Sequence, residues 1–329
     1  MRKIESSHNK GIVTHSKSHP DEYLAELLAR RYGGNLFPNI ENVETAYVDA
    51  GTDTYQGMNG DQLFSAGYLA LGVCGGQFDE HPRPGKPAKE HSCASLMFEY
   101  LLQQQAIPDL EVIAWMQVVD HVNLIDTENP KDKRAPLDLF SIVSNLHRLG
   151  VCEKTVKTLA WAALDAQFKC NLQAVTVGKK AFDLGQQRVA KCGQVEVKIV
   201  AVVSDCEFIL QYAGFGVSGR PNVLIQFEES GNFQIFGMRR TVNLDDVIAR
   251  LRVLEAEARQ LPISNDPVIL RCGGTVKGAN CLYYQEKANR IFNGSLSAPG
   301  VEPTRLGMDV IIDTVVERVR FVPQKKRLK

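Results

Sequence analysis

The first half of the chain alternates short apolar runs with longer segments of helical spacing. Residues 11–16 form an apolar run that predicts a strand, and residues 21–33 place apolar side chains at helical intervals before a glycine stop. Residues 42–51 predict a second strand, which ends at Asp49. Strands that alternate with helices are typical of a parallel α/β sheet, whose functional groups lie on the loops after the strands.

Three further segments continue this pattern. Residues 63–76 are apolar and end at two glycines. Residues 91–105 predict an amphipathic helix that Ser92 could cap. Residues 110–126 predict a largely buried helix or strand that carries Asp120. The first half of the chain therefore predicts an α/β domain built on a parallel sheet.

The pattern changes in the second half. A helical pattern runs from residue 137 to about residue 190, and from Val195 the apolar runs become strand-like, with one helix predicted over residues 244–260. The chain is therefore expected to have three parts: an N-terminal α/β domain over residues 1–150, a helical connector over 151–194 and a smaller C-terminal α+β domain over 195–329.

The composition is that of a globular protein, and its charge gives no general signal for an anionic partner. The chain has 329 residues, of which 44% are hydrophobic and 23% charged, and its formal net charge is zero. A zero net charge offers no chain-wide basic field for nucleic acid or for an anionic membrane. The eight cysteines contain no CxxC pair, and no apolar run approaches the roughly 20 residues of a membrane span. Since no apolar leader begins the chain, we expect a cytoplasmic protein with reduced thiols and no membrane contact.

Histidines and acids gather in the first half of the chain. Six of the seven histidines precede residue 122. His15, His19 and Asp21 form an H-x3-H-x-D motif where the first strand runs into the first helix, so their side chains could converge on one point. Mixed imidazole and carboxylate ligands suit Mn²⁺, Zn²⁺ or Fe²⁺, and carboxylate-rich sites favour Mn²⁺ or Mg²⁺. The alternative interpretation is a helix capped by Asp21, with both histidines on the surface.

Three more acidic motifs follow along the chain. Asp49 ends the second predicted strand, and Asp79, Glu80 and His81 stand in a row after two glycines. Taken alone, Asp49 is typical of a turn and the three-residue run is typical of a solvated loop. Asp120 lies within an otherwise apolar segment. A buried carboxylate is costly unless it is paired or bound to a metal, so Asp120 is expected to have a partner.

The order of these four motifs over residues 11–126 resembles the DHH phosphoesterase superfamily. The opening T-H-x3-H-x-D-E of residues 14–22 and the later G-G-Q-F-D-E-H of residues 75–81 are also similar to the melanocyte-proliferating-gene family of exonucleases. The resemblance implies a parallel-sheet DHH-type domain followed by a smaller substrate-binding domain. Most superfamily members have Asp where this chain has His19, and His where it has Glu80.

The resemblance also implies a centre of two metal ions, usually Mn²⁺, with Mg²⁺ as the alternative. One ion would be bound by His15, His19 and Asp49. The second would be bound by Asp21, Asp49, Glu80 and Asp120, so that Asp49 bridges the two ions.

Two histidines and one turn are expected to act on the substrate. His81 would face the substrate phosphate, where it could donate a hydrogen bond or protonate the leaving alkoxide. His91 could do the same, or be an exposed residue near a helix cap. In the C-terminal domain the resemblance implies a glycine-glycine turn that binds substrate, and its candidate residues are Arg271, Gly273, Gly274 and Lys277. A bulge or a hairpin turn explains the two glycines as well.

These inferences predict a metal-dependent phosphoesterase that hydrolyses a phosphodiester in a short oligonucleotide or nucleotide. The family resemblance points to a 3'-5' exonuclease or oligoribonuclease acting on short RNA. Because phosphate neutralisation supplies most of the affinity for long nucleic acid, a zero net charge favours a short substrate. A pyrophosphatase or phosphomonoesterase, or a non-catalytic nucleotide-binding module with a degenerate site, remains an alternative, and the chain could form a homodimer.

Overall fold

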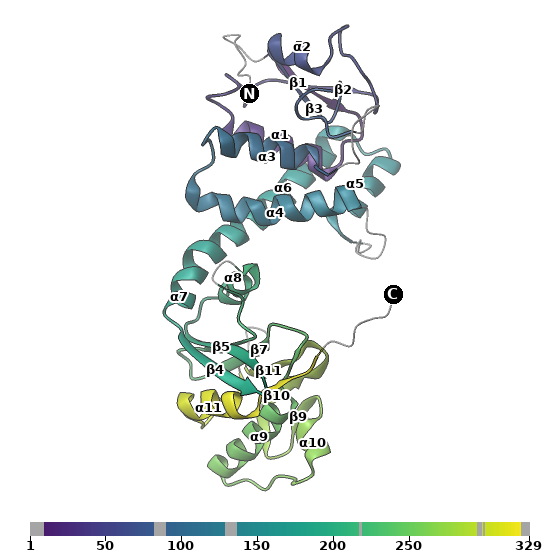
Figure 1. Ribbon diagram of the computed structural model, residues 1–329. Helices are drawn as coiled ribbons and strands as arrows, with labels where there is room; N and C mark the ends of the chain where they lie inside the picture. Colours follow the sequence, from purple (N-terminus) through teal and green to yellow (C-terminus); the bar gives the residue numbers. More distant parts are fainter. Residues whose placement is uncertain are drawn as a thin grey trace. The chain divides into compact units, whose positions relative to one another are not determined.

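The computed structural model describes residues 10–81, 90–128, 137–216, 219–294, 298 and 300–323. The chain folds into two compact units, unit 1 (Met1–Leu172) and unit 2 (Gln173–Lys329) (Figure 1). Unit 1 contains a parallel sheet and unit 2 a larger mixed sheet, so the predicted α/β class is confirmed. The division between the units falls inside residues 151–194, the predicted connector.

Unit 1 is built around a three-stranded sheet with β1 (Gly11–His15) at its centre. β2 (Thr45–Val48) and β3 (Tyr68–Leu71) flank β1, and both run parallel to it. Ile12 and Val13 are fully buried, which explains why this short apolar run forms the central strand. Asp49 follows directly after β2, at the same edge of the sheet as His15, because His15 is in register with the last residue of β2.

The helices of unit 1 alternate with the strands as predicted as far as β3, and after that strand they follow one another. They are α1 (Pro20–Tyr32), α2 (Gly60–Ser65), α3 (Cys93–Gln103), α4 (Asp109–Glu128), α5 (Leu139–Arg148) and α6 (Glu153–Gln173). α1 packs against α3, α4 and α5. Ser92 caps α3 as predicted, because its side chain accepts a hydrogen bond from Ser95 N. The apolar segment 110–126, which the sequence left open between helix and strand, is helical.

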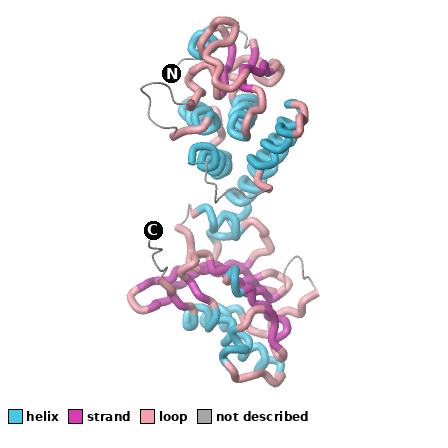
Figure 2. The backbone as a smooth tube through the Cα atoms, turned by 90° about the vertical axis from the view of Figure 1, so that its right-hand side faces the viewer, coloured by secondary structure: helices cyan, strands magenta, loops and turns pink. Residues whose placement is uncertain are grey.

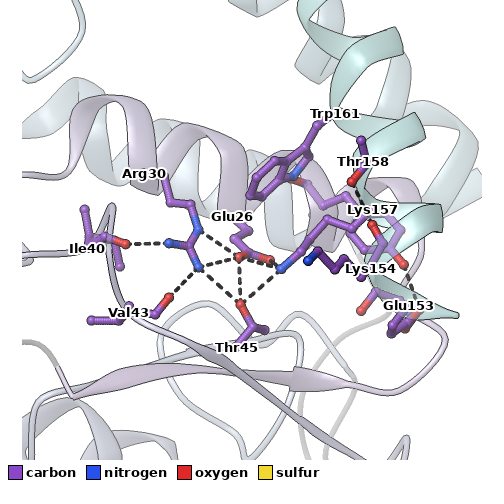
Figure 3. A network of polar contacts seen from close by, with 12 residues as sticks. Glu26, Arg30, Ile40, Val43, Thr45, Glu153, Lys154, Lys157, Thr158 and Trp161 are labelled. Atoms are coloured by element: carbon purple, nitrogen blue, oxygen red, sulfur yellow. Dashed lines mark hydrogen bonds and ion pairs between the residues drawn. The ribbon is translucent and has the colours of Figure 1, made fainter.

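Helix α6 packs on the rest of unit 1 through buried polar and aromatic contacts. The Glu26 carboxylate of α1 accepts hydrogen bonds from Arg30 Nε at 2.9 Å and from Lys157 Nζ of α6 at 3.1 Å (Figure 3). Trp115 of α4 stacks on Phe168 of α6, with ring centroids 4.1 Å apart. The part of the predicted connector that forms α6 is therefore a structural component of unit 1.

Unit 2 contains a seven-stranded sheet in the order β4-β5-β6-β7-β11-β10-β9. Its strands are β4 (Gln186–Cys192), β5 (Val195–Val203), β6 (Val223–Phe227), β7 (Phe233–Gly237), β9 (Gly274–Val276), β10 (Ala279–Gln285) and β11 (Arg290–Asn293). The predicted change to strands is confirmed, but it comes earlier than expected. β4 pairs with β5 as an antiparallel hairpin, so the helical prediction up to residue 190 was wrong for its last residues.

One face of this sheet is covered by α9 (Asp245–Arg259) and α11 (Met308–Arg318), as Figure 2 shows. Leu251 and Val315 of these helices share a core with Ile199, Ile225 and Ile235 of the sheet. The shorter elements of unit 2 are η1 (Ala174–Gly178), α7 (Lys179–Asp183), α8 (Ile209–Phe215), β8 (Val242–Asn243), α10 (Pro267–Arg271), η2 (Glu286–Ala288) and β12 (Arg320–Phe321). Across the described residues, no helix combines the length and the apolar character that a membrane crossing needs.

Candidate metal centre

The centre begins in the turn between β1 and α1. His15 is buried at the carboxyl end of β1, and His19 is the N-cap residue of α1. Glu22, in the first turn of α1, joins the two: its Oε1 lies 2.8 Å from His15 Nε2, and its Oε2 accepts a hydrogen bond from His19 N at 2.7 Å. The capping box of α1 therefore holds the Glu22 carboxylate between the His15 imidazole and the backbone amide of His19.

Four overlapping groups of metal-ligating side chains extend from this turn. In each group the donor atoms lie within 4.8 Å of one another, and the groups are His15, His19 and Glu22; Asp21, Glu22 and Glu80; His19, Asp21 and Asp126; and Asp79, Glu80 and His81. The first two groups share Glu22, and the last shares Glu80 with the second. Such a mixture of imidazole and carboxylate donors could hold divalent cations of the Mn²⁺ class.

The loop after β3 delivers the acidic run to this turn. Gly72, the first residue of that loop, has a φ of +65°, and a Cβ on it would lie 3.0 Å from Glu22 Oε1. Only glycine combines that backbone conformation with so close an approach to the carboxylate. Further along the loop, Asp79 accepts hydrogen bonds from Gly75 N at 2.6 Å and from His81 N at 3.1 Å. These contacts fix the backbone on either side of Glu80, whose side chain is buried.

Both nitrogens of the His15 ring face acceptors. Nε2 faces the Glu22 carboxylate, and Nδ1 lies 3.0 Å from the Ser16 carbonyl oxygen. Burial lowers the pKa of His15, but the hydrogen bond and charge of Glu22 outweigh it and raise the pKa to about 9. Burial likewise raises the pKa of Glu22, but the His15 ring outweighs it and lowers the pKa to about 2. A cation at His15 Nε2 would therefore take the place of a proton.

A second histidine–carboxylate pair lies at the rim of the centre. His81 Nδ1 lies 2.9 Å from Asp79 Oδ1, and the His81 side chain is 53% exposed. Burial raises the pKa of Asp79, but hydrogen bonds from the side chain and amide of His81 and from Gly75 N lower it below its usual range. The pair is thus a charged carboxylate that orients a half-exposed imidazole.

The negative charges of the acidic side chains also act on Cys93, the first residue of α3. Cys93 is fully buried there. Burial raises the pKa of its thiol well above the ordinary value, and the charges of Glu80, Asp21 and Glu22 raise it further. The thiol therefore stays protonated beside the centre.

The structure brings together four of the six predicted metal ligands and leaves two apart. His15, His19, Asp21 and Glu80 are in the overlapping groups, whereas Asp49 and Asp120 are exposed and belong to none of the groups found among the described residues. The expectation that Asp120 is buried was wrong, because α4 turns this position to solvent. Asp126, six positions later on α4, takes part instead.

Sequence reasoning missed Glu22 and Asp126 as candidate ligands. Glu22 is the residue after Asp21 and lies three positions after His19. That is the spacing of a capping box, which indicates that the Glu22 carboxylate folds back onto the turn. Asp126 lies at the end of the apolar segment and carries no local signal. His91 is exposed, 3.5 Å from Glu99, and belongs to none of the groups within the described ranges.

In unit 2 the glycine-glycine turn leads into β9, and arginines near the turn make polar contacts within the unit. Arg271 forms an ion pair with Asp246 at 2.6 Å. Gly274, with a φ of +86°, accepts a hydrogen bond from the buried Arg252 at 2.5 Å, and Gly273 and Lys277 are exposed. Arg252 also donates to the carbonyls of two preceding residues, so it fixes the whole turn from beneath.

The chain was compared with protein families, with curated proteins and with solved structures. No protein family matches the chain, and none of the curated proteins matches it. The chain is similar to the crystal structure of an uncharacterized protein from Helicobacter pylori G27, with 9% sequence identity, 94% of this chain and 98% of that chain covered, and a TM-score of 0.25.

Proposed function

We propose that unit 1 is a metal-dependent phosphoesterase of the DHH type that hydrolyses a phosphodiester in short RNA or a nucleotide, with 3'-5' exonuclease activity. The observation that carries the proposal is the run of overlapping donor groups, with Glu22 shared between two of them, next to the carboxyl end of the central strand. Ligands in parallel α/β sheets are commonly bound at that edge. Mn²⁺ is the proposed metal, with Mg²⁺ as the alternative.

The donor groups would be divided between two ions. His15, His19 and Glu22 would hold one, and Asp21, Glu22 and Glu80 would hold the other, with Asp126 as a further candidate ligand beside His19 and Asp21. Bound there, two divalent ions would supply Lewis-acid activation of a water and neutralisation of phosphate charge. The excess of carboxylates over imidazoles in these groups favours the binding of cations.

His81 is the proposed proton carrier. Since the Asp79 carboxylate can only accept, the His81 nitrogen that faces it, Nδ1, carries a hydrogen. The other nitrogen, Nε2, would donate to a phosphate oxygen when the ring is protonated and pass that proton to the leaving oxygen. The half exposure of the ring would allow contact with a substrate that arrives from solvent.

Unit 2 is the proposed substrate-binding unit. The exposed Gly273 and Lys277 could contact a phosphate through a backbone amide and an ammonium group. Arg271 is a weaker candidate, because binding a phosphate would compete with its ion pair to Asp246.

The proposal is tested by hydrolysis assays with added Mn²⁺ on short RNA, short DNA, dinucleotides, bis-p-nitrophenyl phosphate and pyrophosphate. We expect hydrolysis of the phosphodiesters, and loss of that hydrolysis in the Asp21→Asn and Glu80→Gln variants. Pyrophosphate as the preferred substrate would favour the pyrophosphatase alternative. A chain that binds less than one ion and stays inert with Mn²⁺ would overturn the proposal, and metal binding without turnover would favour a non-catalytic nucleotide-binding module.

A further inference from the structure

The turn that carries the two histidines is held by residues more than a hundred positions away. Ser18, between His15 and His19, is fully buried. Its backbone N–H donates to Glu153 Oε1 of α6 at 3.1 Å, and its carbonyl oxygen lies 3.0 Å from His147 Nε2 of α5. Because a carbonyl can only accept, His147 Nε2 carries the hydrogen in this contact. The N–H and the C=O of Ser18 are therefore each held by a different side chain, and His147 and Glu153 together form a clamp on Ser18.

The two clamping side chains also support each other. His147 Nδ1 lies 3.4 Å from Glu153 Oε2, and the Tyr23 hydroxyl of α1 donates to the same oxygen at 3.0 Å. The side chains of His147 and Glu153 are 7% and 18% exposed, so these polar contacts lie largely out of water, where they are stronger. The clamp is thus a connected network rather than two independent contacts.

The turn needs such support because its backbone is strained. Lys17 has a φ of 60°, in the left-handed region that residues with a side chain seldom occupy. Conformations of this kind persist where surrounding contacts determine them. The Ser18 hydroxyl also donates to the His15 carbonyl at 2.7 Å, so a shift of Ser18 would move the backbone that carries the first imidazole.

We infer that His147 and Glu153 are positioning residues of the metal centre: by holding both peptide groups of Ser18, they set the spacing of His15 and His19. This inference rests on the proposed metal centre of unit 1. Metal sites depend on groups that orient the ligands, and losing one such group commonly weakens metal affinity about 10–100-fold. Both residues lie outside the motifs that indicated the centre in the sequence.

The test compares Mn²⁺ affinity by titration calorimetry, and the visible spectrum of the Co²⁺-loaded protein, among variants of the full chain. We expect His147→Ala and Glu153→Ala to bind Mn²⁺ about 10–100-fold more weakly and to alter the Co²⁺ bands. His147→Gln should recover most of the affinity, since its amide N–H can still donate to the Ser18 carbonyl. Tyr23→Phe is the graded comparison: it removes the hydroxyl that lies 3.0 Å from Glu153 Oε2 and 3.4 Å from His147 Nε2 but neither contact to Ser18, so it should weaken Mn²⁺ binding less than either alanine variant.

The outcomes separate this inference from the proposed function. A wild-type chain that binds no Mn²⁺ contradicts the metal centre itself. A wild-type chain that binds Mn²⁺, with both alanine variants binding equally well, overturns the inference alone, as does an equal loss of affinity in Tyr23→Phe. If the alanine variants fail to fold, Glu153→Leu decides, because it keeps most of the bulk of the side chain and removes the oxygen that accepts from Ser18 N. Its affinity is expected to be lower than that of the wild type, and equal affinity overturns the inference.

Discussion

Glu26 Oε1 of α1 lies 3.1 Å from Lys157 Nζ of α6, so a buried carboxylate pairs with a cation 131 positions later in the chain. The same carboxylate pairs with Arg30 at 2.8 Å, and the Glu26 side chain is only 2% exposed. One carboxylate is therefore shared by two cations, Arg30 of α1 and Lys157 of α6 (Figure 3). Removing the acid and removing one cation should have unequal consequences.

We predict that Glu26→Ala lowers the free energy of unfolding of unit 1 by about 3–5 kcal/mol, because it leaves two largely buried cations without their carboxylate. Lys157→Met should cost about 1 kcal/mol or less, since Arg30 still pairs with Glu26. Urea denaturation followed by tryptophan fluorescence measures this, because Trp115 and Trp161 both lie in unit 1. Lys169→Met, which removes an exposed ion pair from α6, is the control. Equal losses for Glu26→Ala and Lys157→Met would contradict the network.

A second prediction compares two carboxylates on the same helix. Asp126→Asn should weaken Mn²⁺ binding by about tenfold or more, since even outer-shell changes at metal sites cost that much. Asp120→Asn should leave the affinity close to that of the wild type, because Asp120 is exposed and lies in none of the donor groups of the described residues. Titration calorimetry with Mn²⁺ gives both values. The reverse ranking would favour the ligand set implied by the family resemblance.

The sequence predicted the parts of the centre that short local patterns specify, and it did not predict the parts that tertiary packing brings together. The strand ending at His15 and the helix that follows carry their own periodicity, and His19, Asp21 and Glu80 were recognised with them. To choose between Asp120 and Asp126 one must know which face of α4 packs inward. A nearly uniform apolar run does not specify that face. Glu153 could not be predicted as a neighbour of Ser18, because 135 residues separate them and tertiary packing alone brings them together. Asp49 as a bridging ligand stays a prediction.

A third prediction concerns the glycine beside Glu22. Gly72→Ala combines an unfavourable φ with a Cβ at 3.0 Å from Glu22 Oε1, so Glu22 must move. Gly57→Ala has a comparable φ of +75° and no atom within 4 Å, so it imposes the backbone penalty without the contact. Both variants should lose about 1–2 kcal/mol of stability. Only Gly72→Ala should also weaken Mn²⁺ binding, as measured by calorimetry, and an equal effect of both variants on affinity would contradict the proximity of Gly72 to the centre.

The last prediction concerns a buried acid in unit 2. Glu255 of α9 is fully buried and accepts hydrogen bonds from Thr304 Oγ1 at 2.5 Å, Arg259 Nε at 2.6 Å and Arg305 N at 3.1 Å. Burial raises the pKa of Glu255, but these hydrogen bonds lower it below its ordinary value of 4.5. A carboxyl whose pKa is lower in the folded state stabilises the fold at pH above the unfolded value, and that contribution is lost as the pH falls through the folded value.

Glu255→Gln should therefore destabilise unit 2 by on the order of 2 kcal/mol at pH 7. The difference from the wild type should shrink as the pH falls below about 4.5, where protonation of Glu255 makes the wild type resemble the variant. Since both tryptophans lie in unit 1, hydrogen exchange of α9 amides at pH 7, 5, 4 and 3, corrected for intrinsic rates, follows unit 2. Glu257→Gln, at an exposed position of the same helix, is the control and should change little. A difference of the same size at pH 7 and pH 3 would show that the Glu255 charge does not stabilise this unit.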